Sequence, residues 1–115
     1  MVEAIRHLQE QTKSGSALQW NICLSYGSRE VMVMMTKAIA RQVQDGTCSI
    51  DEITEDTLQA SLLLPSCPDL VIRTSGEERI SNFLLYQIAY AELFFLPIYW
   101  PEMSREELLR VLREF

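Results

Sequence analysis

The sequence lacks any regular arrangement of cysteines. Its three cysteines are Cys23, Cys48 and Cys67, and no CxxC pair is present. An odd count without regular spacing argues against a disulfide framework, and the missing CxxC pair argues against a zinc site. We therefore expect reduced thiols, as in a cytoplasmic protein.

Basic residues are also scarce. The chain has 10 lysines and arginines against 16 acidic residues, which gives a formal net charge of -6. Nucleic-acid binding requires clustered basic side chains that neutralise phosphates, so the composition predicts no nucleic-acid partner. The sequence contains neither a Walker A loop nor a GxGxxG motif, and it therefore does not support a nucleotide site of either type.

A long apolar run is the third missing feature. The longest candidate covers residues 84–95, but Gln87 and Glu92 interrupt it, and a spanning helix needs about 18 apolar residues or more. Glu3 and Arg6 stand where a signal peptide would need an apolar region. We predict no transmembrane segment and a cytoplasmic location, with peripheral membrane association as a further possibility.

Apolar residues, by contrast, make up 48% of the chain, which is enough for a packed core. Their periodicity indicates alternating helices and strands, which is typical of an α/β layered fold with a parallel sheet and flanking helices. Three short strands form only a thin sheet, so residues 1–115 are predicted to be one part of a larger domain. We expect strands at 18–26, 69–72 and 93–95, and helices at 2–13, 28–44, 54–62, 81–91 and after Pro101.

Two places carry the sequence signature of a capped helix start. Ser49 is followed three residues later by Glu52, and Ser104 is followed three residues later by Glu107. In such a capping box, each side chain accepts a hydrogen bond from a backbone N–H that the helix itself leaves unpaired. We therefore expect helical turns to begin at both places.

The loop after the expected strand at 69–72 has the residues of an anion site. Arg73 ends that strand, and Arg79 and Ser81 stand at the mouth of the next expected helix. Ligands bind at the carboxyl ends of strands in open α/β sheets, and a helix N-terminus favours anions. Two guanidiniums and a hydroxyl there would form a diphosphate pocket. The alternative is that both arginines form surface salt bridges with the nearby acidic residues Asp69, Glu77 and Glu78.

The segment at 73–92 also resembles the signature of a known enzyme family. It reads RTSGEERISNFLLYQIAYAE, and it is similar to the diphosphate-binding signature of undecaprenyl diphosphate synthase and dehydrodolichyl diphosphate synthase, which are cis-prenyltransferases. Upstream, SYGSR at 25–29 resembles the family's NYGGR, and downstream, YWP at 99–101 resembles its usual Trp-Pro pair. The resemblance covers about residues 18–115 and indicates the C-terminal part of an undecaprenyl diphosphate synthase-like domain.

Four positions depart from the family pattern. Ser75 stands where Gly is also common, and Tyr86 stands where Trp is common. Ser25 and Ser28 replace the Asn and the second Gly of the upstream motif. The upstream match is therefore weaker than the match at 73–92.

The resemblance implies a prenyltransferase that condenses isopentenyl diphosphate onto an allylic diphosphate to make a polyprenyl diphosphate. Arg73, Arg79 and Ser81 would bind isopentenyl diphosphate, and Asn82 would support the loop. Arg29 would support the loop as well, with an approach to a substrate as the alternative. Glu92, at the end of the expected helix, would help to bind Mg²⁺, the implied cofactor. In the family this acidic residue helps to complete the site across a dimer interface, so we expect a homodimer. The residues that the resemblance marks are Arg29, Arg73, Arg79, Ser81, Asn82 and Glu92.

One family motif has no counterpart in residues 1–115. In the family, a loop of the type DGNxRW holds the allylic diphosphate, and its Asp places Mg²⁺ for the reaction. We therefore assign no catalytic residue within this chain and expect it to be inactive alone. The alternative function is a non-catalytic accessory subunit or interaction module of a heteromeric cis-prenyltransferase. Such partners typically lose diphosphate-binding positions, whereas this chain keeps Arg73, Arg79, Ser81 and Glu92.

Overall fold

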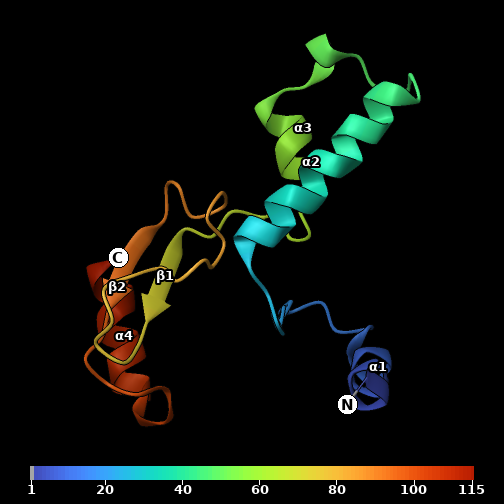
Figure 1. Ribbon diagram of the computed structural model, residues 1–115. Coiled ribbons are helices and arrows are strands. Elements are labelled where there is room, and N and C mark those ends of the chain that lie inside the picture. Colours follow the sequence, from blue (N-terminus) through green and yellow to red (C-terminus); the bar gives the residue numbers. More distant parts are fainter. Residues whose placement is uncertain (1) are drawn as a thin grey trace.

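The computed structural model describes residues 2–115 as helices and one small parallel sheet (Figure 1). This arrangement agrees with the predicted α/β class. Two short 3-10 helices, η1 and η2, accompany the regular helices. In chain order the elements are α1 (Val2–Thr12), α2 (Ser28–Gln44), η1 (Ile50–Glu52), α3 (Glu55–Ala60), β1 (Leu70–Arg73), β2 (Glu92–Phe95), η2 (Trp100–Glu102) and α4 (Arg105–Glu114).

Two of the three expected strands form, and they pair in parallel as predicted. In this pair Leu70 lies opposite Glu92, and Arg73 lies opposite Phe95. Parallel neighbours cannot be joined by a tight hairpin, so residues 74–91 carry the chain from the end of β1 back to the start of β2. The carboxyl ends of both strands therefore lie at the same edge of the sheet.

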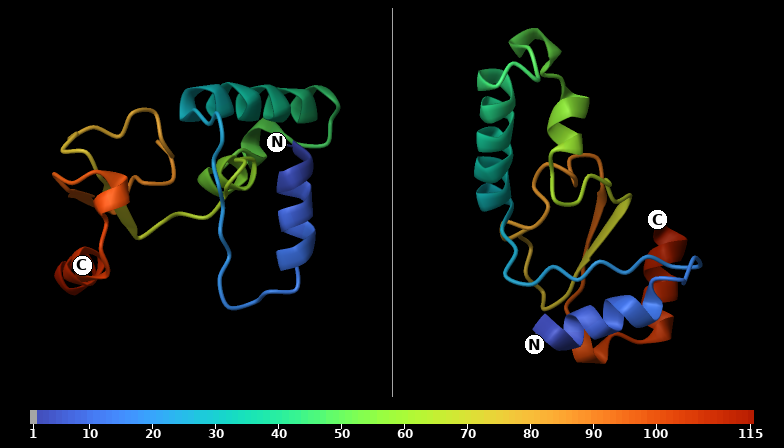
Figure 2. Two further views of the ribbon diagram at one scale, coloured as in Figure 1. Left: turned by 90° about the horizontal axis from the view of Figure 1, so that it is seen from below. Right: turned by 90° about the vertical axis from the view of Figure 1, so that its right-hand side faces the viewer.

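The larger buried cluster lies between α2 and α3, away from the strands. Val31, Met35 and Ile39 recur at helical spacing along α2 and pack with Leu62, which follows α3. Both views of Figure 2 place α2 and α3 side by side, in agreement with this cluster. Of the apolar stripe that predicted the helix at 28–44, the three α2 residues of this cluster form the buried face, whereas Met34 and Ala38 are exposed.

A second buried region lies at α4, beside the strand pair (Figures 1 and 2). Val111 is 0% exposed, and Leu96, which follows β2, is also buried. The other apolar residues of α4, and Phe115 directly after it, keep a large share of their surface accessible. They are Leu108, Leu109, Leu112 and Phe115.

Both predicted helix starts are present. At η1 the full capping box forms, and the Glu52 carboxylate accepts a hydrogen bond from the Ser49 N–H at 2.6 Å. At α4 only one half forms, because Ser104 Oγ accepts from the Glu107 N–H while the Glu107 carboxylate binds Arg110. The hydrogen bonds that the Arg110 guanidinium donates to the Glu107 carboxylate raise the pKa of Arg110.

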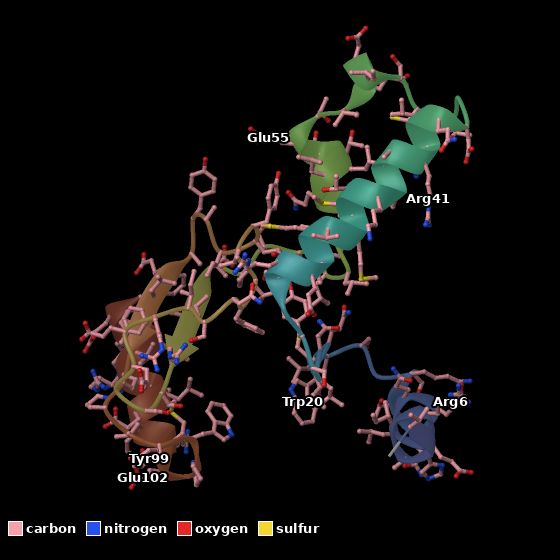
Figure 3. The ribbon with its side chains drawn as sticks, viewed as in Figure 1. Arg6, Trp20, Arg41, Glu55, Tyr99 and Glu102 are labelled. Carbon is pink, nitrogen blue, oxygen red and sulfur yellow. The ribbon has the colours of Figure 1, made fainter. Side chains whose placement is uncertain are left out.

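The expected strand at 18–26 does not form. The segment is extended, but no strand within residues 2–115 pairs with it. Its alternating apolar side chains are exposed, and Trp20 projects from it with 76% of its surface accessible (Figure 3). Alternation leads to a strand only where a neighbouring strand and a buried face exist, and this segment has neither.

The expected helix at 81–91 is also wrong, because this segment is a series of turns. Ser81, Asn82 and Leu84 have positive φ angles of 46°, 64° and 46°, which a right-handed helix does not contain. The Leu85 N–H donates to Ser28 Oγ at 2.9 Å instead of to a carbonyl of its own segment. Contacts with the start of α2 thus override a helical apolar pattern, and Ser81 does not stand at a helix N-terminus.

The chain is extended for its length. Its radius of gyration is 17.6 Å, whereas a compact domain of this size has a value of about 13 Å. The helix α1 stands apart from the other elements (Figure 1), and none of its described residues is buried. No helix within residues 2–115 has the length and apolarity needed to cross a membrane.

Candidate functional site

A cavity of about 350 Å³ lies against the strand pair. Residues of β1, β2 and the turns at 80–88 line it. Arg73, Thr74, Ser75 and Ser81 bring charged and hydroxyl groups, and the remaining lining residues are apolar. This cavity therefore suits a ligand that has an anionic head and a hydrocarbon body.

Arg73 and Ser81 meet in this cavity. Arg73 is the last residue of β1, and its Nη1 donates a hydrogen bond to Ser81 Oγ at 2.9 Å. The sequence analysis expected both residues at one site, and the structure brings them together. Because the hydroxyl is neutral, the guanidinium retains its full charge and further donors for an anion.

Arg79 does not join this pair. Its Nη1 lies 2.5 Å from Glu77 Oε2, and its side chain is 67% exposed. It does not line the cavity, although Ile80 and Ser81, which follow it directly, do. The alternative interpretation, a surface salt bridge, is therefore what the structure has at Arg79.

The loop between the two arginines is held by backbone hydrogen bonds. The Ser75 N–H donates to the Ile98 carbonyl at 2.7 Å, and the Gly76 N–H donates to the Leu96 carbonyl at 2.9 Å. Both residues have left-handed backbones, with φ angles of 78° at Ser75 and 66° at Gly76. This conformation explains why Gly is also found at position 75 in the family. Since these two amides are already paired, an anion must be bound mainly by side chains.

Asn82 caps α2 from a distant part of the chain. Its Oδ1 accepts a hydrogen bond from the Arg29 N–H at 2.9 Å, across 53 residues of sequence. Its backbone carbonyl accepts from the Ser28 N–H, also at 2.9 Å. A Cβ on Gly27 would lie only 2.8 Å from Asn82 Nδ2, so a side chain at position 27 would displace the cap. Arg29 and Asn82, the predicted supporting residues, are thus in contact, and Arg29 contributes its backbone N–H to this hydrogen bond.

Sequence reasoning missed the part that Ser28 plays. Ser28 is 2% exposed, its Oγ accepts from the Leu85 N–H, and the Tyr26 hydroxyl lies 3.3 Å from the same oxygen. Tyr26 also packs edge-on against Phe83, with ring centroids 5.8 Å apart. In the sequence, the signal for this role is that Ser28 replaces the second Gly of the family's NYGGR motif. From the sequence alone, this replacement indicated only that the upstream motif matches less well. These contacts dock the turns at 81–85 onto the start of α2.

Replacing Asn82 with Ala should lower the free energy of unfolding by about 1.5–3 kcal/mol. Loss of a cap costs about 0.5–2 kcal/mol, and a left-handed Ala adds strain of about 1 kcal/mol. The measurement is urea unfolding followed by circular dichroism. The Asn82→Asp variant keeps an oxygen acceptor and tolerates the left-handed backbone, so it should lose much less. Equal losses in the two variants would contradict the capping role.

Glu92 lies at the opposite end of the strand pair from Arg73. It is the first residue of β2, faces Leu70, and is exposed. Leu70, which pairs with Glu92, lies three residues before Arg73 on β1. This separation corresponds to about 10 Å along the strand. The sequence analysis placed Glu92 at the end of an apolar helix, but it lies in a strand, and its exposure removes the cost of burying a carboxylate.

The described part of the chain does not hold a metal site by itself. Among residues 2–115, no three His, Cys, Asp or Glu side chains gather closely enough to bind an ion. Mg²⁺ requires an octahedral set of oxygen ligands, commonly one or two carboxylates together with substrate phosphates and waters. A set of this kind that included Glu92 would need oxygen ligands beyond those that residues 2–115 bring together.

The fold is that of an α/β protein, with a cavity at the edge of a parallel strand pair that Arg73 makes positively charged. The family whose description is "Putative undecaprenyl diphosphate synthase" matches this chain over residues 1–115. The chain therefore belongs to this prenyltransferase family, and the cis-prenyltransferase resemblance is confirmed. The match also includes the first 17 residues, which the motif-based resemblance did not cover.

Curated relatives carry the names of prenyltransferases. The chain is 46% identical over 115 residues to the tritrans,polycis-undecaprenyl-diphosphate synthase (geranylgeranyl-diphosphate specific) of Pyrococcus horikoshii, which covers 98% of this chain and 44% of that protein. It is 40% identical over 114 residues to an isoprenyl transferase of Bacillus anthracis, which covers 97% of this chain and 44% of that protein. The chain thus spans less than half the length of these relatives.

Solved structures confirm the fold class. Lavandulyl diphosphate synthase from Lavandula x intermedia, in complex with dimethylallyl diphosphate, matches with a TM-score of 0.90 and 32% identity, covering 98% of this chain and 50% of that one. A "probable undecaprenyl diphosphate synthase" from Campylobacter jejuni matches with a TM-score of 0.80 and 34% identity, covering 97% and 50%. Both likenesses extend over nearly the whole chain.

Proposed function

We propose that this chain provides the isopentenyl diphosphate site of a cis-prenyltransferase that makes polyprenyl diphosphates. The observation that carries the proposal is the hydrogen bond between Arg73 and Ser81 in the cavity beside the strand pair. Both residues belong to the segment at 73–92 that resembles the family signature. The polar groups of the cavity suit a diphosphate head, and its apolar wall suits an isoprenoid body.

In this function Arg73 and Ser81 bind and orient one substrate. The guanidinium donates paired hydrogen bonds to phosphate oxygens, and the hydroxyl donates a further one. The reaction joins the isopentenyl unit to the allylic unit, and inorganic diphosphate and a proton leave. Holding the isopentenyl diphosphate in one orientation contributes to the rate through proximity. Arg79 contributes a second guanidinium when it turns toward the cavity.

We propose that Glu92 serves the site of a second copy of the chain, where it would supply one oxygen ligand to Mg²⁺. Its exposure and its distance from Arg73 within one protomer support this assignment. Exposed apolar side chains surround it in sequence, which is typical of an interface. Phe83 and Leu93 are each 42% exposed, and Tyr90 is fully exposed.

We therefore expect the chain to form a homodimer through the segment at 83–95. Replacing Leu93 with Glu places a charge in this apolar surface and should shift the protein to monomers, as measured by sedimentation velocity. Val33→Glu is the matched control, because Val33 is exposed to a similar degree (53%) but lies on α2. A wild-type protein that stays monomeric at high concentration would contradict this interface.

We also expect the 115-residue chain to bind isopentenyl diphosphate without transferring it. Binding requires Arg73 and Ser81, which are present, whereas transfer also requires a site for the allylic diphosphate. Calorimetric titration should detect saturable binding. Incubation with labelled isopentenyl diphosphate, Mg²⁺ and geranylgeranyl diphosphate, the substrate in the name of the Pyrococcus relative, should give no labelled polyprenyl product.

The two parts of this experiment test different statements. Absence of binding would contradict the proposed isopentenyl diphosphate site. Formation of product above the level of a Glu92→Ala variant would contradict the expectation that this chain is inactive alone. A non-catalytic accessory subunit that has lost its diphosphate site would show neither binding nor product.

A further inference from the structure

The two arginines of the loop have partners of different charge. Arg73 donates to the neutral hydroxyl of Ser81, whereas Arg79 is paired with the carboxylate of Glu77 at 2.5 Å. The Glu77 side chain is 39% exposed and the Arg79 side chain is 67% exposed, so the pair lies at the surface. The Arg73 guanidinium is therefore available to an anion in the cavity, whereas the Arg79 guanidinium is already paired with a carboxylate.

We propose that Glu77 is an internal competitor for Arg79, so that this guanidinium becomes available only to a ligand able to displace a carboxylate. The inference rests on the proposed diphosphate site and extends it to a residue that controls its affinity and selectivity. Glu77 acts through Arg79 and touches no substrate, which makes it a positioning residue.

Arg79 lies next to the cavity in sequence, so exchanging the Glu77 carboxylate for a ligand requires only a small movement of its side chain. Ile80 and Ser81, the next two residues, line the cavity, so a change in side-chain rotamer is enough to move the guanidinium from Glu77 toward the cavity. An exposed ion pair is weak because water and salt screen it. A diphosphate carries more charge than a carboxylate and can bind Arg79 with paired hydrogen bonds, so it can displace Glu77.

The competition should discriminate between anions by size. A single phosphate can bind at Arg73 and Ser81 without using Arg79, and Glu77 does not oppose that binding. A diphosphate has two phosphoryl groups and can engage both arginines, but it must first separate Arg79 from Glu77. The Glu77 carboxylate therefore reduces the affinity for diphosphate and leaves the affinity for inorganic phosphate nearly unchanged.

The test is a calorimetric titration of the full chain with inorganic pyrophosphate and, separately, with inorganic phosphate. We expect Glu77→Gln to bind pyrophosphate about two- to fivefold more tightly than wild type, which is the range that an exposed ion pair can supply. The matched control is Glu78→Gln, which removes the same charge from the next residue. Glu78 is exposed, and no ion pair involves it within residues 2–115.

A second pair of variants identifies Arg79 as the group through which Glu77 acts. In an Arg79→Ala background, the Glu77→Gln change should raise the affinity for pyrophosphate no more than Glu78→Gln does. The inference is overturned if Glu77→Gln changes the affinity for pyrophosphate only as much as Glu78→Gln does, or lowers it. It is also overturned if Glu77→Gln raises the affinity for phosphate as much as that for pyrophosphate. If neither wild type nor Glu77→Gln binds pyrophosphate, the proposed site fails together with the inference. If wild type binds pyrophosphate but Glu77→Gln does not selectively raise that affinity, the inference fails and the proposed site stands.

Discussion

Replacing Arg73 with Ala is expected to weaken the binding of isopentenyl diphosphate and of inorganic pyrophosphate about tenfold to a hundredfold. Arg73 is the charged group that lines the cavity, and it already lies in contact with Ser81. Hydrogen bonds that involve charged groups contribute about 1.5–3 kcal/mol each, and about 1.4 kcal/mol corresponds to a tenfold change in affinity. Isothermal titration calorimetry measures the effect directly.

The control for this variant is Arg110→Ala. Arg110 lies on α4, where it is paired with Glu107 and Glu114, so its removal changes the net charge equally without touching the cavity. We expect this variant to bind pyrophosphate within about twofold of wild type, because surface charges act weakly over a distance in salt. Equal losses in the two variants would mean that only net charge governs binding, and the assigned site would be wrong.

Replacing Val111 with Asp is expected to disrupt the packing of α4 and to cost about 3–5 kcal/mol of folding free energy. Val111 is 0% exposed, and an uncompensated charge at a buried position destabilises by this amount. Hydrogen exchange monitored by mass spectrometry should show the amides of α4 losing their protection. Thermal unfolding followed by circular dichroism should move to lower temperature.

Leu112→Asp is the matched control for the Val111 variant. It introduces the same side chain at the next position, where 48% of the leucine surface is already accessible, so much less burial is lost. We expect a destabilisation of about 1 kcal/mol or less, as for substitutions near the surface. If both variants destabilise equally, α4 is not anchored through Val111.

The chemistry of the candidate site was largely predictable from contiguous residues. The segment at 73–92 led to the family, and Arg73 and Ser81 were assigned to one site and are found in contact. The orientation of Arg79 was not predictable, because a guanidinium with an acidic residue two positions away has two competing partners. The positions of Glu92 and Arg73 at opposite ends of the strand pair followed only from the register of β1 with β2.

The errors in the predicted fold have a common cause. Residues 18–26 alternate as a strand does, but no strand within the described residues pairs with them. Residues 81–91 have the apolar composition of a helix, but their turns donate to and accept from the start of α2. In both cases the pattern reports which residues prefer burial, while the structure depends on which neighbours are available.

The sequence by itself determined the features that depend on residues close to one another along the chain. These are the apolar stripe of α2, the capping at Ser49 and Ser104, the short strands, and the signature that identifies the family. Only the tertiary structure decided the capping of α2 by Asn82, which of its two expected partners Arg79 takes, and the separation of Glu92 from Arg73. Local propensities and caps act within one or two turns of backbone, whereas these contacts depend on how distant or alternative partners meet once the chain has folded.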